Sequence, residues 1–77
     1  MNNEIYKGKV TAVKPDGNWT EFNKFKVSIE NEDKQIGEFN FLARGEFKKA
    51  IGDMIEYEIK NPTYNSAKLH YKPFNNN

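Results

Sequence analysis

The stretch KFKVSIE, residues 24–30, carries the clearest structural signal in the chain. Its phenylalanine, valine and isoleucine alternate with charged and polar residues, which is the pattern of a half-buried β-strand. Lysines turned toward an apolar interior would be charges without partners, and burying such charges is prohibitively costly. The apolar side must therefore face the core, and we expect Lys24 and Lys26 to point outward.

Segments with strand patterns lie on both sides of this one. Upstream, residues 4–14 are rich in apolar and β-branched residues, and Gly8 among them is typical of a bulge or bend in a small barrel. The turn-forming run PDGN, residues 15–18, predicts the end of that strand. Downstream, the polar run NEDK, residues 31–34, predicts a tight turn into a third strand over residues 35–42.

Two phases compete in the third strand. Phe39 and Phe41 share one side with Gly37, while Ile36 and Leu42 share the other. In one register the two phenylalanines belong to the core, and in the other they form an outward platform on which bases could stack. We favour the core, because a chain this short has few large apolar residues with which to build one.

The second half of the chain predicts one helical segment and two more strands. The spacing of Phe47 and Ile51 predicts one or two helical turns over residues 43–51, ended by Gly52. The remaining strands are expected over residues 54–60 and 67–72, with a loop over 61–66 between them and a frayed tail over 73–77. A 77-residue chain supports one small core, so we expect a single all-β domain forming a closed barrel.

Three strands, a short helix and two strands are the order of the five-stranded Greek-key barrel called the oligonucleotide-binding (OB) fold. The most recognisable part runs from Phe47 to Tyr57, where the short helix turns through Gly52-Asp53 into the fourth strand. Over residues 6–71 the chain resembles the small OB-fold single-stranded-DNA-binding proteins of bacteriophages and bacteria, and more distantly the cold-shock domains. The resemblance implies binding of single-stranded DNA in preference to RNA, in phage or bacterial replication.

The charges are nearly balanced but unevenly distributed. The net charge is +1, with basic residues toward both ends of the chain and acidic residues in the middle. If the two ends meet in the fold, one face is positive while the molecule stays almost neutral. The chain has no cysteine, no apolar run of a signal peptide and none long enough to span a bilayer, so we expect a cytoplasmic protein that makes no membrane contact.

The resemblance also indicates where a ligand would bind. OB proteins hold it on the face of strands two and three, between the loops that join strands one to two and four to five. Aromatic rings for stacking and lysines for phosphate are the residues that hold single strands. These types occur at Trp19, Phe22, Lys24, Lys26, Tyr64, Lys68 and Lys72, with Lys7, Lys9, Phe39 and Phe41 as weaker candidates. The aromatic residues could instead cap the barrel, and the lysines could simply be solvated.

Catalytic chemistry is not indicated. His70 is the only histidine and cysteine is absent, so the sequence offers no metal-ligand cluster, and it has no glycine-rich phosphate loop. We therefore expect no enzyme activity, no cofactor and no metal. The leading hypothesis is a sequence-tolerant single-stranded nucleic-acid binder. The alternative is a protein-interaction module, such as a phage-encoded inhibitor or adaptor, with a protein partner or a second copy bound to the barrel.

Overall fold

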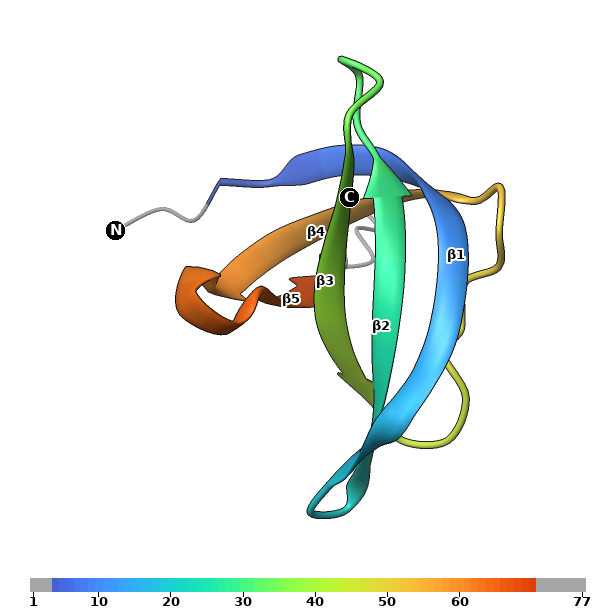
Figure 1. Cartoon of the computed structure of the whole chain (residues 1–77), viewed down its shortest axis with the longest axis vertical. Helices are drawn as coiled ribbons and strands as arrows, with labels where there is room; N and C mark the ends of the chain where they lie inside the picture. Colours follow the sequence, from blue (N-terminus) through green and yellow to red (C-terminus); the bar gives the residue numbers. More distant parts are fainter. Residues whose placement is uncertain (1–3, 71–77) are drawn as a thin grey trace, which may run out of the picture.

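The computed structural model describes residues 4–70, which form five strands and one short 3-10 helix (Figure 1). The strands close into a barrel with the order β1-β2-β3-β5-β4, which confirms the prediction of an all-β, five-stranded closed barrel. All neighbouring pairs are antiparallel except β3 and β5, which are parallel. The elements are β1 (Tyr6–Trp19), β2 (Phe22–Glu30), β3 (Ile36–Ala43), β4 (Met54–Asn61), η1 (Pro62–Tyr64) and β5 (Ser66–Leu69).

Strand β1 closes the barrel by changing partner along its length. Its first part, Tyr6 to Lys9, pairs with β4, and from Lys9 onward it pairs with β2. Gly8 is buried at this change. A Cβ atom there would collide with the side chain of Ile29 and would lie 2.9 Å from the Glu30 carbonyl oxygen. The absence of a side chain therefore lets β1 cross β2 closely as it curves over the barrel (Figure 1).

We expect Gly8→Ala to destabilise the barrel by about 1–3 kcal/mol, because the added methyl group meets backbone that cannot easily move. Thermal unfolding followed by circular dichroism measures the effect. Lys9→Ala is the matched control: Lys9 is the exposed neighbour on the same strand, and its loss should change stability by about 0.5 kcal/mol at most. Equal melting temperatures for the two variants would contradict this account of Gly8.

The prediction that residues 15–18 end the first strand is wrong. Strand β1 continues to Trp19, which pairs with Phe22, and the chain reverses at Thr20-Glu21. The turn-forming residues instead produce a register shift between Pro15 and Asn18, with Gly17 in the left-handed region at a φ of 84°. A bulge accommodates a proline without an N–H and a glycine with positive φ, so pairing with β2 resumes beyond them.

The predicted helix between the third and fourth strands is also wrong. Residues 44–53 contain bends and one turn and no helix, and the only helix among residues 4–70 is η1, between β4 and β5. Phe47 turns toward the barrel while Ile51 is exposed, so the two do not form one apolar face. Gly45 and Gly52 both have positive φ, and a lone helical turn is only marginally stable.

The core consists of the inward residues of the strands. Phe25, Val27 and Ile29 are buried, which confirms the alternation predicted for β2. Phe41 is 2% exposed and the partly buried ring of Phe39 lies 5.2 Å from that of Tyr57, so β3 has the core register that we favoured. The buried apolar residues are Val10, Phe25, Val27, Ile29, Phe41, Ile55, Tyr57 and Ala67.

The polar turn predicted after β2 is confirmed. The side-chain oxygen of Asn31 accepts hydrogen bonds from the N–H groups of Asp33 and Gln35, and the Asn31 N–H donates to the Gln35 carbonyl. The last predicted strand is present in its first part, as β5. Residues 71 and 72 of that strand and the predicted tail, 73–77, lie outside the described residues. Within residues 4–70 there is no helix of the length and apolar character that crossing a membrane requires.

Candidate nucleic-acid interface

A groove of about 690 Å³ runs between the β1–β2 hairpin and the η1 turn. Residues of β2 and β3 form its floor, and residues of the hairpin, of the end of β4, of η1 and of β5 form its sides. The groove is lined by Asn18, Trp19, Lys24, Asn40, Leu42, Lys60, Asn61, Tyr64, Ser66, Ala67 and Lys68.

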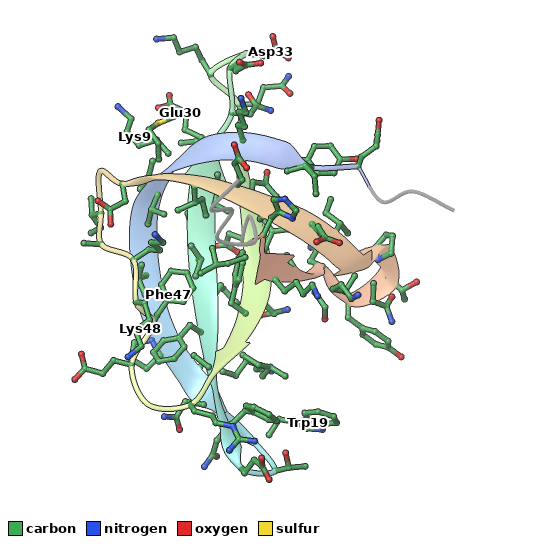
Figure 2. The ribbon with its side chains drawn as sticks, turned by 180° about the vertical axis from the view of Figure 1, so that it is seen from behind. Lys9, Trp19, Glu30, Asp33, Phe47 and Lys48 are labelled. Atoms are coloured by element: carbon green, nitrogen blue, oxygen red, sulfur yellow. The ribbon has the colours of Figure 1, made fainter. Side chains whose placement is uncertain are left out.

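Trp19 stands at one end of the groove. It is the last residue of β1, at the tip of the hairpin, where Thr20 adopts a positive φ of 55°. Its side chain is directed away from the barrel (Figure 2) and the residue is 61% exposed, which confirms that it is not part of the core. A large aromatic ring at the tip of a tight hairpin and open to solvent is a surface on which another flat group can stack.

Tyr64 stands on the opposite side, on the turn η1, and is 69% exposed. The Asn61 side chain caps this turn by accepting a hydrogen bond of 3.0 Å from the Thr63 N–H. Strand β3 anchors the same turn, because the Asn40 side-chain amide donates to the Tyr64 carbonyl at 2.8 Å and the Asn40 N–H donates to the Asn65 carbonyl at 2.7 Å. The backbone of the turn that carries Tyr64 is therefore held in place relative to β3.

The groove lining is positively charged although the whole chain is almost neutral. Lys24, Lys60 and Lys68 contribute to it, and none of the described residues that line it is an aspartate or a glutamate. Lys24 has one acidic neighbour at the rim, since its Nζ lies 3.7 Å from a carboxylate oxygen of Asp16. Both groups of this pair are substantially exposed, so the attraction is weak and a phosphate can compete for the lysine.

The structure brings together four of the residues that the sequence indicated, Trp19, Lys24, Tyr64 and Lys68. Sequence reasoning missed Lys60, Leu42 and the three asparagines of the lining. The outward phase of β3 was the available signal for Leu42, because it leaves this residue on the surface, 44% exposed. No local signal indicated Lys60, which lies in the groove lining because β4 pairs with β5 and β5 pairs with β3.

The other predicted residues lie elsewhere. Phe22 is half-buried beneath the guanidinium of Arg44, whose carbon atom is 5.2 Å from the ring centre, and Arg44 also pairs with Glu21. Lys26 lies opposite Asn40 in the β2–β3 register but does not line the groove. Phe39 and Phe41 face the core, and Lys72 is outside the described residues.

Lys7 and Lys9 do not line the groove. Lys7 pairs with Glu56 of β4 at 4.0 Å. Lys9 lines a small hollow with Glu30 and Glu32, at the opposite end of the molecule from Trp19 (Figure 2). Acidic side chains are thus adjacent to both lysines, which makes this end a poor surface for a polyanion.

The shifted pKa values also belong to the β1–β4 side. The pKa of Tyr6 is raised because its hydroxyl group donates a hydrogen bond to the Glu4 carboxylate and because that carboxylate is negatively charged. Burial raises the pKa of Tyr57, against which Tyr6 stacks. Both phenols are therefore uncharged at neutral pH.

Within residues 4–70 no three histidine, aspartate or glutamate side chains come close enough together to hold a metal ion. Comparisons with protein-family models, with curated proteins and with solved structures find no significant match to this chain.

Proposed function

We propose that this protein binds single-stranded nucleic acid in the groove, DNA in preference to RNA, with little dependence on base sequence. One observation carries the proposal: two exposed aromatic rings, Trp19 and Tyr64, flank a groove whose lining within residues 4–70 includes three lysines and no carboxylate. Proteins that hold single strands without sequence preference combine these two features, a positive groove and rings on which bases stack.

We further propose that the barrel is of the OB type. The strand order β1-β2-β3-β5-β4 and the short parallel contact of β3 with β5 support this proposal. The groove also lies on the β2–β3 side, between the β1–β2 and β4–β5 connections, as the oligonucleotide site of such barrels does. The preference for DNA and a role in phage or bacterial replication follow from the resemblance of the sequence to small OB proteins.

In the proposed complex, successive bases stack on Trp19 and Tyr64 while Lys24, Lys60 and Lys68 contact the phosphates. Stacking uses the π face that every base has, and phosphate contacts carry no sequence information, so binding tolerates many sequences. Leu42 supplies an apolar floor between the lysines.

We expect oligo-dT to quench the fluorescence of Trp19, the single tryptophan of the chain. A titration at several salt concentrations tests the charge contribution. Three lysines in the groove predict a slope of log K against log salt of about −2, from about 0.7 per phosphate contact on a single strand. Unquenched fluorescence at high oligonucleotide concentration would contradict the proposal, as would binding that is insensitive to salt.

Paired charge reversals locate the binding surface in the same assay. The double variant Lys24→Glu with Lys60→Glu changes the groove, whereas Lys9→Glu with Lys34→Glu changes the net charge equally beside the acidic hollow. The first pair should weaken binding strongly and the second only slightly.

A protein-interaction module is the second candidate, because exposed Trp19 and Tyr64 beside Leu42 are also typical of protein interfaces. A groove that binds no oligonucleotide would favour that candidate.

A further inference from the structure

A second hollow adjoins the groove. It measures about 430 Å³ and shares two lining residues with the groove, Leu42 of β3 and Lys68 of β5. Both hollows are therefore open to the same stretch of surface.

The β3–β5 contact explains why the two hollows meet. These strands are paired through one residue pair, Asn40 with Ser66. They are parallel, so Leu42 and Lys68 each lie two residues beyond that pair, where the paired register has ended. The groove and the second hollow therefore adjoin at Leu42 and Lys68, just beyond the last pair of β3 and β5.

The lining of the second hollow combines apolar and cationic groups. Phe41, Phe47 and Leu69 provide apolar surface, and Arg44, Lys48 and Lys68 provide positive charge. None of the described residues that line it has a carboxylate, although Glu21 pairs with Arg44 nearby.

Phe47 is the aromatic surface of this hollow. It is half-buried, and its ring centre lies 5.9 Å from that of Phe25 and 5.3 Å from that of Phe41, so packing fixes it in position. Lys48 follows it on the same segment and is exposed (Figure 2). A fixed ring beside an exposed cation offers one contact to a base and one to a phosphate.

We propose that the second hollow is a subsite for the same bound strand and receives one further nucleotide beyond those in the groove. Its base lies against Phe47 and Leu42, and its phosphate lies near Lys48 and Arg44. Lys68, which lines both hollows, contacts the backbone where the strand passes between them. This inference rests on the proposed function and adds the path that the strand takes as it leaves the groove.

Charge and shape favour a nucleotide over other occupants. A rim with three cationic residues, to which none of the described residues adds a carboxylate, favours an anion, and an apolar floor that includes an aromatic ring suits the flat face of a base. Sites for single small ligands typically measure about 300–1,000 Å³, a range that includes this hollow. Because the hollow adjoins the groove, the next nucleotide of a strand bound in the groove can reach it.

A series of oligo-dT lengths, from about 4 to about 16 nucleotides, tests the subsite. Short oligonucleotides occupy the groove alone, and longer ones should gain affinity by entering the second hollow. The salt slope should steepen with length from about −2 toward about −3.5, because Arg44 and Lys48 add two phosphate contacts. Lys48→Glu should leave the affinity for short oligonucleotides and the melting temperature unchanged. For long ones it should remove the added affinity and reduce the slope by about 1.

Lys34→Glu is the control with the same change in net charge. Lys34 lies on the turn before β3, at the opposite end of that strand from Arg44 and Lys48, and we expect no length-dependent loss there. If Lys48→Glu weakens short and long oligonucleotides by the same factor, or weakens neither, the subsite is overturned and the groove remains. If the wild-type protein binds no oligonucleotide of any length, the proposed function and the subsite are overturned together.

Discussion

Replacing Trp19 and Tyr64 together by alanine should weaken oligo-dT binding by about 30-fold or more while the protein stays folded. Alanine substitution of a stacking ring typically costs about 1–3 kcal/mol of binding free energy per base, so the loss of both rings should cost at least about 2 kcal/mol. Both residues are more than half exposed, and neither belongs to the core cluster. The melting temperature should therefore be almost that of the wild type. Competition against a labelled oligonucleotide measures binding in the absence of the tryptophan.

Tyr6→Ala is the aromatic control for this experiment. Tyr6 is exposed on the β1–β4 side and stacks on Tyr57, away from the groove, so its loss should not affect binding. Two results would count against the proposed roles of Trp19 and Tyr64. The first is binding by the double variant as tight as that of the wild type. The second is a stability loss of about 3 kcal/mol or more from either single substitution, which is typical of a buried aromatic residue.

Phe41→Ala should cost about 3–5 kcal/mol of unfolding free energy, the largest effect on stability that we expect from any substitution to alanine. Phe41 is almost fully buried, and its ring lies 5.3 Å from that of Phe47 and 6.4 Å from that of Tyr57. Truncation removes these contacts and leaves a cavity in the centre of the barrel. Small domains have only about 5–15 kcal/mol of stability in total, so the variant should be close to unfolded at room temperature. Urea denaturation followed by circular dichroism measures the loss.

Ile36→Ala on the same strand is the matched control. Ile36 is 62% exposed on the outward side of β3, so its truncation should change stability by about 0.5 kcal/mol at most. A comparable loss for both variants would mean that the inward and outward sides of β3 have been assigned incorrectly.

The alternating pattern of single strands was readable from sequence. In β2 the period of two, together with the cost of burying lysine, was sufficient to predict which residues form the core and which side faces solvent. The polar run of residues 31–34 likewise predicted the turn after β2, because turn-forming residues act locally. Whether Trp19 and Tyr64 cap the barrel or face solvent was left open by the sequence, and the structure shows both exposed.

Two local signals were misleading because tertiary contacts override them. Residues 15–18 have the composition of a turn, yet pairing with β2 resumes beyond a bulge there and carries the strand on to Trp19. Residues 43–51 have helical spacing, but Phe47 packs against the rings of Phe25 and Phe41. A lone helical turn contributes too little free energy to compete with such packing.

From the sequence alone came the class of fold, the phase of β2 and four residues of the groove, since each depends on neighbours within one strand or loop. The tertiary structure alone decided how those residues meet. Asn40 holds the turn that carries Tyr64 across 24 positions of sequence. Lys60 and Leu42 enter the same groove only because the barrel places β5 between β3 and β4. The two hollows adjoin where the β3–β5 pairing ends. The sequence could not predict this, because the residue pattern of a strand shows which side faces the core but not which distant strand pairs with it.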